Sequence, residues 1–242
     1  MRLLLEEIMK KLSVIASLIL ASAFCGFAGD VASFADIGFS EDGKTYIFGQ
    51  YGKTDKKFEA WAEIFTVNVE KNDFVRSENF KTEPSKNTRE LTSKQCFEVL
   101  REKAEWKINK YNVKHYNPEN LLYVRQGETK SPVDEIVFKD YDASTETDNI
   151  YWHIKLCPTF EGTSGNVKSS FYINVEKKDQ NGNVVFSKKV GTPGVKRKNV
   201  TSYRISRIFT DNTKKNVVFV LEKTLDDSTG TSIRYMVETF AL

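Results

Sequence analysis

The chain has 242 residues, of which 40% are hydrophobic, 29% charged and 12% aromatic, as is usual for a globular protein that buries one sizeable core. Its 36 basic and 33 acidic residues leave a formal net charge of +3, which is too small to indicate a nucleic-acid or membrane-surface partner. We therefore expect one domain, or two tightly joined lobes, and no nucleic acid.

Residues 1–28 have the layout of a secretory signal peptide. Lys10 and Lys11 precede an apolar run that is followed by small residues, and this order is typical of exported proteins. Two cleavage sites fit the pattern of small residues, one after Ala23 and one after Ala28. We prefer the site after Ala28, because it leaves Gly29-Asp30 as the start of a mature domain of residues 29–242, which has no transmembrane helix. Because two acidic residues precede Met9, that methionine is the alternative true start. The protein is predicted to be periplasmic or secreted.

Three cysteines bear on the compartment. Cys25 follows the apolar run and raises the alternative of an envelope-anchored lipoprotein, although Phe24 stands where lipid attachment signals have a small residue. Cleavage after Ala28 removes Cys25 and leaves Cys96 and Cys157. An oxidising compartment allows these two to form a disulfide, and two free thiols are an equal alternative.

The mature chain begins with a predicted β-hairpin. Apolar and polar residues alternate over 33–39 and 45–50, and the turn between them contains Gly43. Residues 62–69 alternate in the same way and predict a third antiparallel strand. The hairpin does not require Gly49-Gln50-Tyr51-Gly52, in which two glycines bracket an amide and a phenol, so Gly49, Gln50, Tyr51 and Gly52 are candidate ligand-binding residues.

A linker and a helix are predicted at about 81–111. Residues 81–91 are polar and contain Pro84, which indicates a linker or loop. Apolar residues then recur at helical spacing, and Thr92 and Ser93 precede them as capping residues, so a helix is predicted over 93–109. Its apolar face should cover a sheet.

Short strands are predicted at 121–124 and 135–138, followed by an acidic run. Residues 140–149 contain four carboxylates, which could suit a calcium ion. No glycine-centred loop ending in glutamate is present. The sequence therefore favours a solvated loop over a metal site.

The C-terminal half is the most regular part of the chain. Asn181-Gly182 lies between alternating runs and indicates a hairpin. The predicted fold is mainly β, with antiparallel sheets in a sandwich-like or two-lobed arrangement and one clear α-helix. A small irregular β-propeller is the alternative, because residues 39–48 and 209–219 resemble propeller blade repeats. The predicted strands are 151–156, 170–175, 184–186, 203–209, 217–221 and 233–240.

No arrangement of residues predicts catalysis, a metal or a cofactor. His115 and His153 lie in no catalytic motif, and their spacing from Cys96 and Cys157 matches no zinc site. No glycine-rich loop precedes a helix in a phosphate-binding pattern. We therefore assign no catalytic residue, no metal and no cofactor.

Residues 191–200 hold the one concentrated basic patch. Lys196 and Arg197 are candidates to recognise an acidic surface or a polysaccharide, and Tyr203 could add a stacking face. The plain alternative is a solvated loop that joins two strands.

Several blocks of the mature chain resemble a bacterial family of predicted secreted proteins of unknown function, which has spirochaete members among others. The resemblance implies export and a shared fold, and it supplies no activity and no catalytic residues. Residues 81–149 carry none of it. The blocks are Gly-Asp-Val-Ala-Ser-Phe at 29–34, Gly-Phe-Ser-Glu-Asp-Gly at 38–43, Phe-Gly-Gln-Tyr-Gly at 48–52, Gly-Thr-Pro at 191–193 with Arg197, Val200 and Tyr203, and Ile-Arg-Tyr-Met-Val-Glu-Thr at 233–239.

These observations favour a non-enzymatic binding or interaction module of the cell envelope, with an envelope protein or polymer as its partner. One alternative is a hydrolase of an envelope polymer that uses scattered carboxylates such as Asp30, Asp36 and Asp42, since paired carboxylates perform acid and base chemistry without a local motif. The other is the lipoprotein anchored through Cys25.

Overall fold

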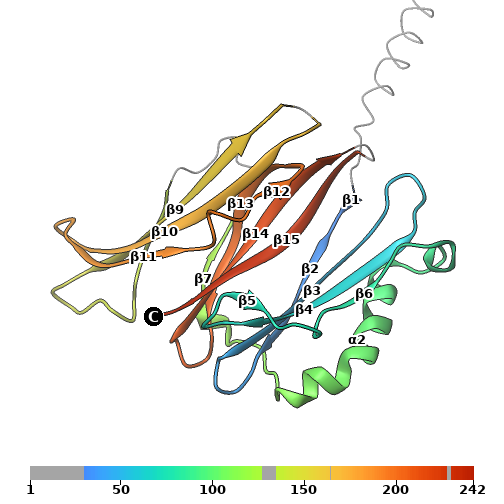
Figure 1. The fold of residues 1–242 in the computed structure, drawn as a ribbon. Coiled ribbons are helices and arrows are strands. Elements are labelled where there is room, and N and C mark those ends of the chain that lie inside the picture. Colours follow the sequence, from blue (N-terminus) through green and yellow to red (C-terminus); the bar gives the residue numbers. More distant parts are fainter. Residues whose placement is uncertain (1–29, 127–134, 164, 228–229) are drawn as a thin grey trace, which may run out of the picture.

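The computed structural model describes residues 30–126, 135–163, 165–227 and 230–242. The predicted signal peptide and Cys25 lie outside these ranges. Within them the chain forms three β-sheets and one α-helix (Figure 1). No helix in the described ranges combines the length and the apolar character needed to cross a membrane.

The N-terminal sheet has the strand order β2-β3-β4-β5, and β6 also pairs with β4. Its first two strands form the predicted hairpin. The helix α2 (Ser93–Lys110) follows this sheet in the chain. The strands are β2 (Ser33–Phe39), β3 (Thr45–Lys53), β4 (Ala60–Asn68), β5 (Asp73–Phe74) and β6 (Phe80–Thr82).

The central sheet has the order β1-β15-β14-β13-β7, and the outer sheet has the order β11-β10-β9-β8 with β12 paired to β10. All pairs are antiparallel except β1 with β15. The central strands are β1 (Asp30–Val31), β7 (Leu121–Val124), β13 (Val200–Thr210), β14 (Asn216–Asp227) and β15 (Gly230–Ala241). The outer strands are β8 (Ile136–Lys139), β9 (Ile150–Glu161), β10 (Lys168–Asp179), β11 (Val184–Val190) and β12 (Arg197–Lys198).

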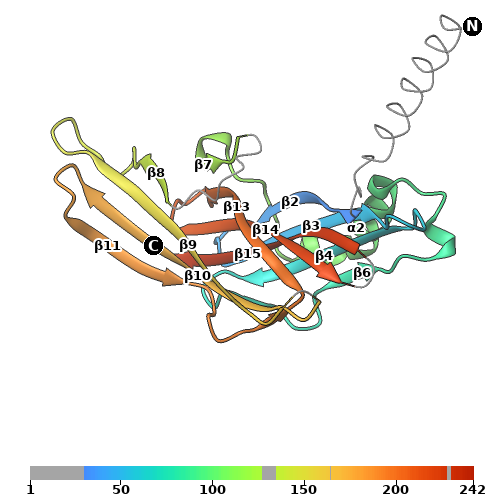
Figure 2. The ribbon, with the colours of Figure 1, turned by 90° about the horizontal axis from the view of Figure 1, so that it is seen from above.

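The sheets and the helix stack as layers, with the central sheet between the other two (Figure 2). The side chains of strand β14 explain why the central sheet is covered on both faces. Val217, Phe219 and Leu221 pack toward the outer sheet, whereas Val218 and Val220 pack toward the N-terminal sheet. All five are fully buried, because a strand with apolar side chains on both faces must be covered on both faces. The predicted sandwich-like fold is confirmed, and the stacking is unlike the radial blades of a propeller.

Helix α2 begins and packs as predicted. The Thr92 hydroxyl accepts a hydrogen bond from the Gln95 backbone N–H (3.1 Å), and the Gln95 side chain accepts one from the Thr92 N–H (2.9 Å). This reciprocal capping satisfies two N–H groups that the first turn leaves free. Phe97 and Leu100 are buried against the N-terminal sheet.

The region predicted as a linker is more ordered than expected. Strand β6 ends inside residues 81–91, and a short 3-10 helix, Lys86–Thr88, follows it. Within this region, the Arg89 guanidinium donates a hydrogen bond to the Glu59 carboxylate (3.3 Å), and the Arg89 carbonyl accepts one from the Lys53 amino group (3.0 Å). The sequence pattern missed this order because the segment is held by polar contacts rather than by apolar periodicity.

The glycines of the 49–52 segment are explained by packing. A Cβ at Gly49 would lie 2.4 Å from a ring carbon of Phe97, and one at Gly52 would lie 2.8 Å from the Trp61 ring. Between them, Tyr51 stacks on Phe97 with ring centroids 4.9 Å apart. The absence of side chains at both glycines therefore lets aromatic rings lie directly on β3.

We expect Gly49→Ala to lower the free energy of unfolding by about 1–3 kcal/mol, the usual range for an overpacked core. The new methyl group would also lie 3.0 Å from the Glu63 carbonyl oxygen, so a shift of Phe97 alone would not relieve the contact. Urea denaturation measures the effect. Gly194→Ala is the control, because nothing lies within 4 Å of its Cβ position. Equal unfolding midpoints for the two variants would contradict the packing explanation.

Candidate functional site

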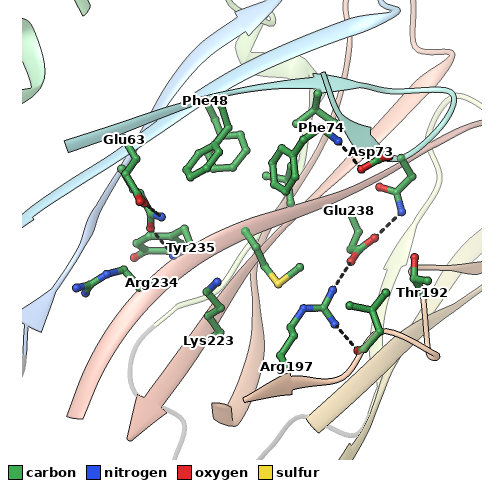
Figure 3. Close-up of a pocket in the computed structure, with 17 residues that line it drawn as sticks. Phe48, Glu63, Asp73, Phe74, Thr192, Arg197, Lys223, Arg234, Tyr235 and Glu238 are labelled. Atoms are coloured by element: carbon green, nitrogen blue, oxygen red, sulfur yellow. Dashed lines mark hydrogen bonds and ion pairs between the residues drawn. The ribbon is translucent and has the colours of Figure 1, made fainter. Parts of the chain in front are cut away.

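A pocket of about 520 Å³ lies beside β15, where this strand faces both neighbouring sheets (Figure 3). Its volume falls in the range of small-ligand sites. Phe48 and Phe74 line it on the side of the N-terminal sheet, and Arg197 and Lys223 line it on the other side of β15. The pocket therefore surrounds an edge of the central sheet.

The pocket exists because most of β15 has a strand on one side only. Strand β15 pairs with β14 from Gly230 to Ala241 without a register shift, whereas β1 pairs with it only at Ser232 and Ile233. The remaining edge must find other hydrogen-bond partners, because unpaired N–H and C=O groups are costly when buried.

Gln50 supplies one such partner. Its side-chain oxygen accepts the backbone N–H of Tyr235 (2.7 Å), and its side-chain nitrogen donates to the Glu63 carboxylate (2.7 Å). Gln50 is 3% exposed, so its own end of each bond is buried, while Glu63 and Tyr235 are half-buried. This amide links β3 to the edge of β15.

Asn72 supplies a second partner, on the same edge. It adopts a left-handed backbone conformation (φ 50°) in the turn after β4, which asparagine tolerates better than most residues. Its side-chain oxygen accepts the backbone N–H of Thr239 (2.6 Å). The Thr239 hydroxyl in turn donates to the Val69 carbonyl (2.8 Å), so the N-terminal sheet contacts β15 at both ends of the pocket.

A buried carboxylate, Glu238, lies at one end of the pocket. It accepts a hydrogen bond from the Asn72 side chain and lies 3.6 Å from the Arg197 guanidinium. Burial raises the pKa of Glu238, while the Asn72 bond and the Arg197 charge oppose that rise. The Arg197 guanidinium also lies over the Phe171 ring at 4.8 Å, so both charged groups have protein partners.

The opposite end holds a second ion pair. The Arg234 guanidinium stacks on the Trp61 ring at 4.1 Å and pairs with Asp30. The Trp61 indole N–H also donates to Asp30 (3.1 Å). A smaller cavity of about 200 Å³ lies beside these residues. The charge of Arg234 is therefore already compensated.

Lys223 is different from the other cations of the pocket. Within the described ranges its amino group has no hydrogen bond and no ion pair. Burial lowers its pKa, Arg197 and Arg234 add to that effect, and Glu63 opposes it. Among the described residues the pocket thus contains one cation that forms no hydrogen bond and no ion pair with the protein, with Glu63 as the acidic group that opposes the pKa shift. A cation without such a partner can pair with a negatively charged group of a ligand.

The residues predicted from the sequence lie in different environments. Gln50 and Arg197 line the pocket. Lys196 forms an ion pair with Glu161 at the surface. Tyr203 is buried in the core, where its hydroxyl lies 2.8 Å from that of Ser169. In the 49–52 segment, only Gln50 reaches the pocket.

Lys223 was not among the residues predicted from the sequence, although the pattern held a signal. Val217, Phe219 and Leu221 alternate along one face of β14, and Lys223 is the next position on that face. A lysine at a position that continues a buried apolar face is unusual unless it is paired or functional. The same signal is present at Glu63 on β4 and at Glu238 on β15, which are charged residues in strands that otherwise contribute to the core.

The carboxylates considered for hydrolysis each have a structural partner. Asp36 accepts a hydrogen bond from the Tyr46 hydroxyl (2.9 Å) and lies 3.2 Å from a His115 ring nitrogen. Burial raises the pKa of Asp36. Asp42 accepts the backbone N–H of Lys44 (3.1 Å) within the hairpin turn. Asp30 binds Trp61 and Arg234 as described above, so the three carboxylates share no partner.

The acidic run at 140–149 forms a turn in which Asp140 has partners both within the turn and on β10. Asp140 accepts the backbone N–H groups of Asp142 (3.2 Å) and Ala143 (3.1 Å), and it pairs with Lys177 at 2.8 Å. In the parts of the chain that the structure describes, no three His, Cys, Asp or Glu side chains are placed to hold a metal ion.

Cys96 and Cys157, the two cysteines within the described ranges, are free thiols. Cys96 is buried between α2 and the N-terminal sheet, whereas Cys157 lies on β9 in the outer sheet. The central sheet separates these layers, so the disulfide left open by the sequence is not formed. His153 contacts Glu135 (3.0 Å) rather than either cysteine.

The chain is similar to a described family of proteins. A family model described as "Predicted secreted protein (DUF2259)" matches residues 47–240. The match confirms the resemblance inferred from the sequence, and it extends through residues 81–149, where the recognised blocks were absent. No curated protein and no solved structure matches the chain significantly.

We expect Gln50→Met to lower the free energy of unfolding by about 1–3 kcal/mol, because the Tyr235 N–H and the Glu63 carboxylate would lose a buried partner. Urea denaturation measures the loss, and amide hydrogen exchange at Tyr235 should accelerate. Gln180→Met, at an exposed turn position, is the matched control and should change little. An unchanged exchange rate at Tyr235 would show that Gln50 does not hold this edge.

Glu238→Gln tests the raised pKa of that carboxyl. Burial raises the pKa of Glu238 above its ordinary value of 4.5, so the folded protein binds this proton more tightly than the unfolded chain does. The contribution of the protonated carboxyl to folding stability is therefore complete below pH 4.5 and is lost as the pH rises through the raised pKa. Glutamine does not titrate and can still bind Asn72. We expect the stability of the wild type, relative to the variant, to fall as pH rises from about 4 to 8. Unfolding curves that differ by a constant amount across this range would contradict the assignment.

Proposed function

Because the chain belongs to a family of predicted secreted proteins, we propose that it is an exported, non-enzymatic binding protein whose ligand site is the pocket beside β15. The site acts outside the cytoplasm, in the periplasm or beyond the cell. Its ligand carries a negatively charged group and an apolar part. The partner is a component of the cell envelope, either a protein or a polymer.

The observation that carries this proposal is the ammonium group of Lys223, which has no hydrogen bond and no ion pair among the described residues and lies in a pocket with an apolar wall. Phe48 and Phe65 stack with ring centroids 5.1 Å apart, and Phe65 contacts Phe74 at 5.3 Å. Phe74 is 43% exposed, so this aromatic wall reaches solvent. An anion at Lys223 with an apolar group on this wall would give the ammonium group an ion-pair partner and cover the rings.

The other polar groups of the pocket support a binding role. Gln50 and Asn72 use their amides to hold β15, and Arg197 and Arg234 are paired with carboxylates. These contacts fix the walls in place, and a preformed site reduces the entropy lost on binding. The hydrolase alternative has weaker support, because Asp30, Asp36 and Asp42 are engaged separately in structural contacts.

The lipoprotein alternative concerns how the protein is retained, and it is compatible with the same pocket. Mass spectrometry of the mature N-terminus separates the two forms. A free N-terminus at Gly29 excludes acylation at Cys25, whereas a lipid-modified Cys25 would place the binding domain at a membrane surface.

We expect Lys223→Met to abolish the binding of small apolar anions. The probes are octanoate, N-acetyl-leucine and hexyl phosphate, with inorganic phosphate as the probe that lacks an apolar part. Thermal unfolding should show a rise in Tm with at least one apolar anion for the wild type, because binding to the native state stabilises it. The rise should disappear in Lys223→Met and persist in the control Lys188→Met, which changes an exposed lysine of β11. Equal stabilisation of both variants, or none in the wild type, would contradict the proposal.

A further inference from the structure

The edge of β15 that lines the pocket is open at one residue. The outward-facing groups are those of the odd-numbered residues: the Ile233 carbonyl accepts the Ala32 N–H (3.0 Å), and the N–H groups of Tyr235 and Thr239 bind side-chain amides. Since N–H and C=O directions repeat every second residue in a regular strand, the backbone groups of Val237 point the same way.

Val237 has no partner on that side among the residues that the structure describes. Val237 lies opposite Val220 of β14, in a non-hydrogen-bonded pair, so its N–H and C=O both point away from β14. Natural sheets cover or block exposed edges, because an unpaired edge readily accepts another strand. Here Gln50 and Asn72 block the positions two residues before and two residues after Val237, and the pocket begins between them.

The two faces of the open edge differ in chemistry. A residue added opposite Val237 would point toward the N-terminal sheet, as Val237 does, and would meet the aromatic wall of Phe48, Phe65 and Phe74. Its neighbour opposite Met236 would point to the other face of the sheet. Lys223 lines the pocket on that face. At the far end, Arg197 is already paired with Glu238.

We propose that the pocket binds a short extended peptide segment, which adds as a strand to the edge of β15 at Val237. An apolar residue of the peptide lies opposite Val237 against the aromatic wall, and an adjacent acidic residue pairs with Lys223. Backbone hydrogen bonds at Val237 provide the register, and the two side chains provide the specificity. This inference rests on the proposed function of the pocket and names its ligand class.

The flanking amides limit the length of the segment. Tyr235 and Thr239 are four residues apart, which corresponds to about 13 Å of strand. About three residues of peptide fit between the Gln50 and Asn72 side chains. A segment of this length is compatible with the pocket volume of about 520 Å³.

Amide hydrogen exchange tests the open edge itself. In the free protein, the Val237 N–H should exchange faster than those of Tyr235 and Thr239, which have side-chain partners. If Val237 is protected as strongly as its two neighbours, the edge is not open and the inference is overturned.

Binding is then measured with defined tripeptides on the full mature chain. The probes are acetyl-Ala-Leu-Glu-amide and acetyl-Glu-Leu-Ala-amide, which place the acid on either side of the apolar residue. Matched probes replace Glu by Gln, or carry an N-methyl group on leucine that removes the backbone donor. Calorimetry gives the Kd, and the ¹⁵N shift and exchange rate of Val237 report the contact.

We expect one acidic peptide to bind and to protect the Val237 N–H. The Gln peptide and the Lys223→Met variant should each weaken binding about tenfold or more, as loss of a charge-assisted bond does. N-methylation should abolish binding, and Lys188→Met should leave the Kd unchanged.

The outcomes separate this inference from the proposed function. If apolar anions bind in a Lys223-dependent way while the peptides do not bind, or bind equally well after N-methylation, the pocket is a small-anion site and the peptide inference is overturned. If neither the anions nor the peptides bind, both proposals are overturned.

Discussion

The two-sided burial of β14 and β15 determines the rest of the structure. Val217 to Leu221 alternate between two cores, so the central sheet needs a layer on each face. Those layers leave one edge of β15 without a neighbouring strand. The side-chain amides of Gln50 and Asn72 take the place of that strand. The pocket lies between these two amides, at the part of the β15 edge that neither of them contacts.

Local patterns predicted the local structure well. Strand β2 and the start of α2 lie where alternation and capping placed them, because both depend on neighbouring residues. Strands β9 and β10 are twelve residues each, longer than predicted, since their ends are polar ribbons without apolar alternation. The segment at 81–91 was predicted to be a linker because its order depends on polar contacts with distant residues, such as that of Arg89 with Glu59.

The site was only partly visible in the sequence. Gln50 and Arg197 were singled out, and both line the pocket. The glycines beside Gln50 serve the packing of Phe97 and Trp61 instead, a role that no local pattern reveals. Lys223 could be predicted as a site residue only if its strand was known to be covered on both faces. On a half-exposed strand the same lysine would be an ordinary surface residue.

The contacts that define the pocket are expected to form late in folding. Gln50 and Tyr235 are separated by 185 positions, and Asp30 and Arg234 by 204. Contacts at such separations close large loops and form late, because the entropy of closure is lost before the contacts compensate for it. The outer sheet and the first hairpin can form from neighbouring segments, but the pocket cannot exist until the last strand of the chain is in place. In a chain that is exported unfolded, the pocket therefore forms only after strand β15 has been translocated.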